Sequence, residues 1–317
     1  MNEEVLEIIE QVAMDKDTIL DLSANDLTEI PKEVFQLSHL ELLSLDYNQL
    51  TTLPPEIAKL SQLKSLEVRE NKLLFISAEI AQLTQLEKLS LNGNQLVILP
   101  LEIAKLPKLK ALNLSNNKLL ALPSEISQLA KLRGLNLSRN QLIGMPLEVC
   151  QLPKLKHLDL SANQLITILP EIAQLTKLRE LNLSENKLTD LPTEFAQLTG
   201  LRQLDLNTNK LTVWPAAIAQ LTKLRVLQLN DNQIEICPNE ISQLIELEWL
   251  DIRNNKLTNL PNTISQLSDL EWLSLEGNPL PIPPKILESE ADDPEEIISY
   301  LFNSGYQLKV RQNLTGL

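Results

Sequence analysis

Residues 178–198 read LRELNLSENKLTDLPTEFAQL, and almost every other part of the chain repeats this unit. Counted from Asn186 within it, an asparagine returns every 23 positions without a change of register. The twelve asparagines are Asn25, Asn48, Asn71, Asn94, Asn117, Asn140, Asn163, Asn186, Asn209, Asn232, Asn255 and Asn278. A fixed period of this length, with leucines at constant offsets, indicates a solenoid whose successive coils stack and bury their leucines against one another.

Each unit contains one alternating segment just before its asparagine, for example Leu112-Asn-Leu114-Ser. Such alternation predicts a short, half-buried strand, and twelve of these strands stacked in parallel predict one curved sheet. The asparagine is expected to turn inward at the bend that follows. There its amide would satisfy backbone groups of its own coil and of the adjacent coil, since an unpaired buried amide costs about 1–3 kcal/mol.

The segment after the bend predicts a short helical turn. Ten of the twelve units have proline six positions after the asparagine, and Ser77 and Leu169 take its place in the other two. Proline suits the first position of a helical turn, and a glutamate two residues later suits the first turn. Apolar residues every three positions fit a 3₁₀ or α turn. The predicted fold is therefore an α/β solenoid, with a curved parallel sheet on the concave face and short helical turns on the convex face.

The period predicts a repeat domain over residues 18–288, with a cap at each end. Residues 1–17 contain an amphipathic helix at 3–14, expected to cover the first coil; a helix that recruits a partner is the alternative. Residues 289–317 are expected to form a capping helix, at 293–303, and a tail. Its start, Asp293-Pro294-Glu295-Glu296, offers an N-cap, a proline at the first position and acids in the first turn.

The strand motif L-x-x-L-x-L-x-x-N-x-L and the outer motif L-P-x-E-I-x-x-L resemble the 23-residue leucine-rich repeats of intracellular signalling scaffolds, Ras-suppressor-type proteins and bacterial Roco proteins. The resemblance covers residues 18–288. The exit from Gly277-Asn-Pro-Leu280 to the helix around Tyr300 is similar to the boundary where such arrays meet a GTPase domain. The chain has no G-x-x-x-x-G-K-[ST] loop of its own. The resemblance implies a protein partner, with a small GTPase or a GTPase domain as one class.

Cysteine content and hydropathy predict a cytoplasmic protein. Cys150 and Cys237, the two cysteines, lie four repeats apart, on the order of 19 Å at the spacing of strands, which is beyond disulfide reach. The acidic N-terminus lacks the basic and apolar regions of a signal peptide, and no run of 18 apolar residues predicts a membrane span.

The sequence predicts no enzyme, no cofactor and no metal site. The two histidines, His39 and His157, fall in different coils, roughly 24 Å apart at the spacing of strands. That separation excludes a metal site that uses both histidines. The sequence also offers no catalytic set of serine, histidine and aspartate in which a histidine could act as the base.

A row of basic residues is expected along the edge where the strands begin, seven positions before each asparagine. We call it the basic rim: Lys110, Arg133, Lys156, Arg179, Arg202 and Arg225. It could steer an acidic protein to this edge, or form a solvated edge paired with glutamates. Nucleic acid is not expected as a partner, because the net charge is −14 and no aromatic residues alternate with these bases.

Two tryptophans, Trp249 and Trp272, occupy the same position in neighbouring units, six before the asparagine. They are predicted to lie about 5 Å apart on the open face of the sheet. Exposed aromatic pairs of this kind are typical anchors for a protein partner. The tail at 304–317 folding back over them is the alternative. The proposed binding residues are Trp249, Trp272, Asp251, Arg253, Glu276 and Val226. Trp214, in contrast, is predicted to lie in the core.

The predicted function is a non-catalytic scaffold that binds a protein partner through the concave face, in intracellular signalling. Two alternatives remain open: a regulatory recognition arm of a Roco-like GTPase, and a self-assembling structural scaffold. The sequence does not name the partner, the pathway or the oligomeric state.

Overall fold

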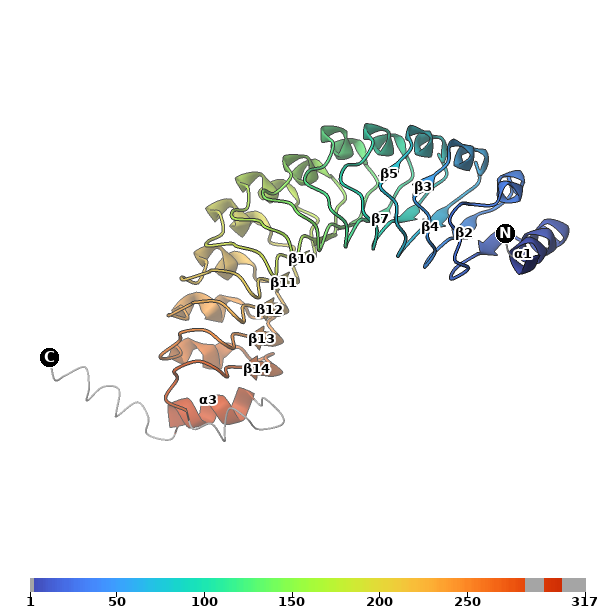
Figure 1. Cartoon of the computed structure of the whole chain (residues 1–317). Coiled ribbons are helices and arrows are strands. Elements are labelled where there is room, and N and C mark those ends of the chain that lie inside the picture. Colours follow the sequence, from blue (N-terminus) through green and yellow to red (C-terminus); the bar gives the residue numbers. More distant parts are fainter. Residues whose placement is uncertain (1–2, 283–293, 304–317) are drawn as a thin grey trace. The chain divides into compact units, whose positions relative to one another are not determined.

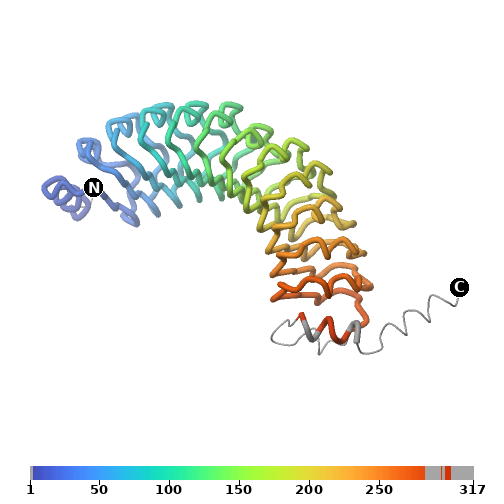
Figure 2. Tube along the Cα trace, turned by 180° about the vertical axis from the view of Figure 1, so that it is seen from behind, coloured from blue at the N-terminus to red at the C-terminus, as the bar shows by residue number. Residues whose placement is uncertain are grey.

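A computed structural model describes residues 3–282 and 294–303 of the 317-residue chain. Contacts divide the chain into two compact units, Met1–Gln164 and Leu165–Leu317, and each is described by itself. In each unit the coils follow one another in chain order, with strands on one side and short helical turns on the other (Figure 1). Figure 2 shows the same succession of coils from behind.

The first unit begins with helix α1, Glu3–Asp15. Its strands are β1 Ile19–Asp21, β2 Leu42–Ser44, β3 Thr52–Leu53, β4 Ser65–Glu67, β5 Phe75–Ile76, β6 Lys88–Ser90, β7 Ala111–Asn113, β8 Gly134–Asn136 and β9 His157–Asp159. Its 3₁₀ turns are η1 Lys32–Gln36, η2 Pro55–Lys59, η3 Ala78–Gln82, η4 Leu101–Lys105, η5 Ser124–Gln128 and η6 Leu147–Gln151.

The second unit repeats the same order of strand and turn. Its strands are β10 Glu180–Asn182, β11 Gln203–Asp205, β12 Val226–Gln228, β13 Trp249–Asp251 and β14 Trp272–Ser274. Its 3₁₀ turns are η7 Pro170–Gln174, η8 Thr193–Gln197, η9 Ala216–Gln220, η10 Asn239–Gln243 and η11 Asn262–Gln266. Helix α3, Pro294–Asn303, follows.

The main sheet has 12 parallel strands in chain order, as the period predicts, and β3 and β5 form a second, two-stranded sheet. Each main strand is three residues long, and within each unit neighbouring strands pair at a shift of one repeat, as in Leu112 opposite Leu135. With positions counted from the asparagine of each unit, the strands occupy positions −6 to −4, that is, six to four residues before it. The alternating pattern predicted strands at positions −5 to −2. The ladder of hydrogen bonds nevertheless continues past the strands, since Leu114 N donates to Asn136 O at 2.8 Å.

Leucines at fixed offsets fill the core. The middle residue of every main strand is buried, for example Leu112 at 1% and Leu204 at 1% exposure, while the first residue is exposed or half-buried in most strands. Trp214, at 5% exposure, lies in this core as predicted, and Cys237, at 4%, lies there too. Each coil therefore adds a constant layer of apolar side chains to its neighbours.

The repeated asparagine bonds its own coil to the preceding one. Asn140 Oδ1 accepts a hydrogen bond from Leu119 N at 3.0 Å, and its Nδ2 donates to Leu114 O at 2.9 Å; both groups belong to the preceding coil. The same Nδ2 lies 3.0 Å from Leu137 O and 3.1 Å from Ser138 O in its own coil. The same four contacts recur at Asn94, Asn117, Asn163, Asn209, Asn232 and Asn255. The predicted role of this residue is confirmed.

The residue just before each asparagine adopts a left-handed backbone conformation, which the sequence did not predict. Only Gly93 and Gly277 are glycines there; φ is +70° at both. The other ten are non-glycine residues with positive φ: Ala24, Tyr47, Glu70, Asn116, Arg139, Ala162, Glu185, Thr208, Asp231 and Asn254. This conformation turns the chain from the strand toward the core, while the N–H still bonds to the next coil, as Thr208 N does to Asn230 O at 2.9 Å.

The outer segments are 3₁₀ turns of five residues, and their prolines lie one position earlier than predicted. Pro123 precedes η5 in an extended conformation, with φ −66° and ψ 140°, and its carbonyl accepts from Ile126 N at 3.0 Å. Ser77 and Leu169, which replace proline, adopt the same conformation. Proline therefore fixes the extended entry to the turn. Glutamates lie in the first turn as predicted, for example Glu56 and Glu125.

Helices adjoin both ends of the repeats. In α1 the side chains of Val5, Ile9 and Val12 are buried. In α3 Ile297 is buried and Pro294 is the first helical residue. Asp293, the predicted N-cap of this helix, and the predicted tail at 304–317 lie outside the described residues.

We predict that Asn140→Ala will lower the midpoint of urea unfolding, with an expected loss of about 1–3 kcal/mol in the free energy of unfolding. The substitution leaves Leu119 N–H buried without a partner, at about 1–3 kcal/mol, and removes one of two hydrogen bonds to Leu114 C=O, which still accepts from Asn117 Nδ2. Gln141→Ala, at the adjacent exposed position, is the control and should change the midpoint little. An unchanged midpoint for Asn140→Ala would contradict the bridging role of the amide.

We predict that Thr208→Asn will stabilise the protein by about 1 kcal/mol. Thr208 is β-branched and holds φ at +52°, a conformation that asparagine tolerates better. Thr212→Asn, at an exposed position without positive φ, is the matched control and should give no gain. Thermal unfolding followed by circular dichroism measures both, and equal shifts for the two variants would refute the prediction.

Candidate functional site

The open face of the sheet carries the candidate site. In each main strand the middle side chain points to the core, so the side chains at positions −6 and −4 lie on the other side of the sheet. We call this side the open face. The predicted binding residues all lie on β12, β13 or β14, or at the bends after β13 and β14, within the second unit.

Trp249 and Trp272 form a stacked pair on the open face. The two residues are paired in the register of β13 and β14. Their ring centroids lie 4.5 Å apart and their planes differ by 6°. Trp249 is 37% exposed, which is high for a tryptophan, and Trp272 is half-buried. The predicted spacing is confirmed, and part of the pair is accessible to solvent.

Hydrogen bonds hold the tryptophan pair and the residues next to it in place. Trp272 Nε1 donates to Ser274 Oγ at 2.6 Å, and Ser274 is buried. Asp251 accepts from Arg253 through both carboxylate oxygens, at 3.0 Å from Nε and 2.7 Å from Nη2. Glu276 Oε2 lies 3.9 Å from Arg253 Nε. These contacts fix the orientation of Trp272 and of the guanidinium.

Burial divides the predicted binding residues into two groups. Asp251 has only 3% of its side chain exposed, so it positions Arg253 and offers a partner little surface. Arg253, with 45% of its side chain exposed, and Glu276, with 37%, remain accessible. Val226, paired with Trp249 in the register of β12 and β13, is half-buried.

The basic rim follows the start of the strands in both units. In the first unit Arg133 N donates to Lys110 O, and Lys156 N donates to Arg133 O, each at 2.8 Å. In the second unit Arg202 N donates to Arg179 O, and Arg225 N donates to Arg202 O, also at 2.8 Å. These bonds place the rim residues of each unit one strand apart.

Several side chains of the rim have partners within the chain. Lys110 forms an ion pair with Glu87 at 2.6 Å, Arg225 pairs with Glu248, and Arg179 Nη1 donates to Gly200 O at 2.6 Å. Arg133, Lys156 and Arg202 are exposed, and over residues 3–282 and 294–303 no ion pair involves them. Three residues of the basic rim therefore pair within the chain, as the alternative of a solvated edge expects. The other three stay accessible to an acidic partner.

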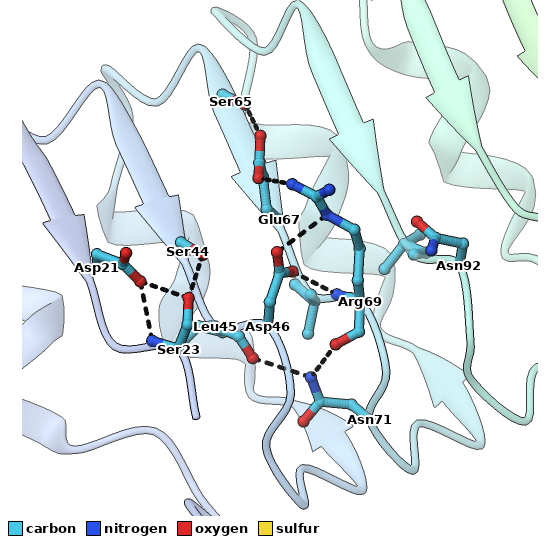
Figure 3. Close-up of polar contacts among 12 residues, drawn as sticks. Asp21, Ser23, Ser44, Leu45, Asp46, Ser65, Glu67, Arg69, Asn71 and Asn92 are labelled. Atoms are coloured by element: carbon cyan, nitrogen blue, oxygen red, sulfur yellow. Dashed lines mark hydrogen bonds and ion pairs between the residues drawn. The ribbon is translucent and has the colours of Figure 1, made fainter. Parts of the chain in front are cut away.

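A polar cluster that the sequence reasoning missed crosses the open face at the start of the first unit (Figure 3). It consists of Asp21, Ser23, Ser44, Asp46, Glu67 and Arg69. Arg69 Nε lies 2.9 Å from Asp46 Oδ2, and its Nη2 contacts Glu67. Lys88 Nζ lies 2.7 Å from Glu67 Oε1. A comparison of positions −4 and −2 across the first three units would have found this group of charged and polar residues.

Burial and charge act in opposite directions on the carboxyl groups of the polar cluster. Burial raises the pKa of Asp46, against the hydrogen bond and the charge of Arg69. Burial also acts to raise the pKa of Glu67, but hydrogen bonds from Lys88 and Arg69 and their charges outweigh it and hold this pKa below its ordinary value. The cluster therefore pairs its one arginine with two of its three carboxylates.

The histidines are not brought into a catalytic arrangement. His39 lines a cavity of about 700 Å³ next to α1, together with Glu10, Lys16 and Glu33, whereas His157 is exposed on β9. Over the described ranges, no three residues among His, Cys, Asp and Glu are grouped so that they could hold a metal ion. No helix among the described residues is long and apolar enough to cross a membrane.

Known proteins share this arrangement. The family model for a leucine-rich repeat region matches residues 100–214. A second leucine-rich repeat model matches residues 18–73 and 222–280, and a third matches residues 85–106. A leucine-rich repeat protein of Leptospira interrogans, LIC12759, is 39% identical with a TM-score of 0.74, over 87% of this chain and 77% of that one. The chain belongs to the leucine-rich repeat family. A comparison with curated proteins gave no match.

Two other solved structures extend the likeness of this leucine-rich repeat chain. An internalin (inlF) from Listeria monocytogenes has a TM-score of 0.77 at 24% identity over 92% of both chains, which shows the shared fold. The Arabidopsis receptor kinase HAESA, solved with the peptide hormone IDA and the co-receptor SERK1, is 27% identical with a TM-score of 0.66. The match covers 88% of this chain and 53% of the HAESA chain, so this chain spans about half of that structure. Leucine-rich repeat proteins generally serve as scaffolds for protein–protein interaction.

We predict that Glu67→Gln will lower the urea midpoint at pH 7, by about 1 kcal/mol or less, and that the difference will vanish in acid. The depressed pKa means that Glu67 stabilises the fold above the ordinary pKa of about 4.3 and that this stability is lost as the pH falls through the folded pKa. Glu56→Gln, an exposed substitution with the same change of charge, is the control. A loss that persists unchanged at pH 3 would contradict an electrostatic origin.

Proposed function

We propose that this leucine-rich repeat chain is a non-catalytic module that binds a protein partner through the open face of its sheet. The observation that carries the proposal is the stacked tryptophan pair. Tryptophan is costly to leave in water and is enriched at the centres of protein interfaces. Trp249 nevertheless remains 37% exposed, while most core side chains of the same coils are fully buried.

The surroundings of the pair support binding rather than a purely structural role. Trp272 is held by Ser274, and Arg253 is held by Asp251, so these side chains are ordered before a partner arrives. An ordered aromatic and arginine surface loses little side-chain entropy on binding. The binding residues are then Trp249, Trp272, Arg253 and Glu276, with Val226 at the margin and Asp251 as the positioning residue.

The proposed setting is cytoplasmic signalling. Neither Cys150 nor Cys237 forms a disulfide and both are buried, as expected of thiols in a reducing compartment, and burial raises the pKa of Cys237 to about 12. A small GTPase or a GTPase domain is the proposed class of partner. Its support is the resemblance of the repeats to those of Ras-suppressor-type and Roco proteins. If the partner is a Roco-like GTPase domain, the proposed role of the chain is the regulatory recognition arm of that GTPase.

We predict that the double variant Trp249→Ala/Trp272→Ala will lose capture of the protein partners that the wild-type chain retains in a pull-down, by at least tenfold. Removal of two central anchors costs several kcal/mol of binding energy. His157→Ala, at position −6 on β9, is the control for a change on the open face. Circular dichroism establishes that each variant is folded. A folded double variant that captures the same partners would refute the assignment.

A further inference from the structure

Four acidic residues border the tryptophan pair at the start of β13 and β14. We call them the acidic edge: Glu246, Glu248, Asp269 and Glu271. Glu248 directly precedes Trp249, and Glu271 directly precedes Trp272. Glu248 is half-buried, whereas the other three are exposed. In the six coils before them, the same two positions carry the basic rim and, except at Gly200, a lysine, so the sign of the edge reverses at β13.

Backbone bonds keep the acidic edge next to the tryptophans. Glu271 N and Trp272 N both donate to Glu248 O, at 2.8 and 3.0 Å. Glu248 N and Trp249 N both donate to Arg225 O at 2.9 Å. Successive strands of a sheet lie about 4.8 Å apart, so the carboxylates at position −7 stand in a row beside the indoles.

The acidic edge already attracts one guanidinium of the chain. Arg225 bonds to Glu248 through Nε at 2.7 Å and also through Nη2. The bond to Glu248 and its charge, with the charges of Glu246 and Glu271, raise the pKa of Arg225. Arg225 thus pairs with Glu248, whereas Glu246, Asp269 and Glu271 stay exposed. These three carboxylates are available to bind a second cation.

The tryptophan pair supplies the apolar part of a site for such a cation. Trp272 stacks on one face of Trp249, and the register places the smaller Val226 on the other side. A valine is too short to cover the outer ring of an indole, which agrees with the 37% exposure of Trp249. Cations bind preferentially over the face of tryptophan, and arginine also stacks there through its planar guanidinium.

We propose that the protein partner inserts an arginine at this corner of the open face, with its guanidinium stacked on Trp249 and bonded to the acidic edge. This inference rests on the proposed function and specifies the chemistry of the partner, a basic segment of a protein. A guanidinium suits the corner better than an ammonium, because it can stack on a ring and bond to a carboxylate in its own plane at the same time. The acids disfavour a phosphate-bearing partner.

The test uses the full chain and a fluorescein-labelled peptide, Gly-Ser-Arg repeated three times, with its citrulline analogue as the neutral isostere. Fluorescence polarisation measures binding in 50 mM NaCl. We expect the arginine peptide to bind at least tenfold more tightly than the citrulline peptide, and to weaken at least tenfold with Trp249→Ala. Equal binding of the two peptides, or full binding by Trp249→Ala, would overturn the proposal.

A second set of variants isolates the contribution of charge. Glu246→Gln/Asp269→Asn/Glu271→Gln should weaken the arginine peptide about tenfold. Glu171→Gln/Glu180→Gln/Glu194→Gln removes the same charge elsewhere in the second unit and should change binding less than twofold. Equal loss in both triple variants would reduce the effect to net charge and overturn the site.

Two further outcomes separate this inference from competing explanations. In the first, the wild-type chain fails to bind the arginine peptide while the full-length variant Lys309→Gln/Arg311→Gln binds it. That result would assign the corner to the basic residues of the chain's own C-terminal segment and would overturn the assignment to a partner. Loss of pull-down capture in the double tryptophan variant, without any binding of the arginine peptide, would leave the proposed function standing and refute the arginine. If the double tryptophan variant captures the same partners and the arginine peptide does not bind, both the proposed function and the arginine inference are refuted.

Discussion

The buried amide of the repeated asparagine is the constraint on which the rest of the structure depends. A backbone bend inside a solenoid leaves N–H and C=O groups that no strand or helix can pair. Asn140 satisfies such groups in two coils at once, through Leu119 N and Leu114 O on one side and Leu137 O on the other. No other side chain of this size offers both a donor pair and an acceptor. The 23-residue spacing follows, because each coil must return its amide to the same place.

The prediction of the fold succeeded because the period carries most of the information. Leucines and asparagines at fixed offsets determine which side chains are buried, and burial determines the register of the sheet. Two details escaped because they depend on backbone geometry that many residue types can adopt. The left-handed residue before each asparagine includes Ala24, Arg139 and Thr208, so no single residue type marks it. The proline could begin or precede the turn, and the extended conformation at Pro123 decides for the latter.

The candidate site was predictable in position but not in detail. The column that holds Trp249 and Trp272 follows directly from the period, and the stacked geometry agrees with it. The burial of Asp251 and its bond to Arg253 depend on side-chain conformations that sequence spacing does not specify. The polar cluster around Glu67 and Arg69 escaped because its charges lie in different repeats and at two different positions. Such networks become visible only when equivalent positions are compared across neighbouring coils.

The reach of the asparagine contacts has a consequence for how this chain acquires its structure. The bonds from Asn140 to the preceding coil join residues 21 and 26 apart, and residues paired between neighbouring strands, such as Leu112 and Leu135, are similarly close in sequence. Low contact order of this kind lets a few neighbouring coils nucleate and the remainder add one at a time. Duplication of one whole repeat in the gene would preserve every such bond, whereas insertion of a single codon would displace the amide from its partners.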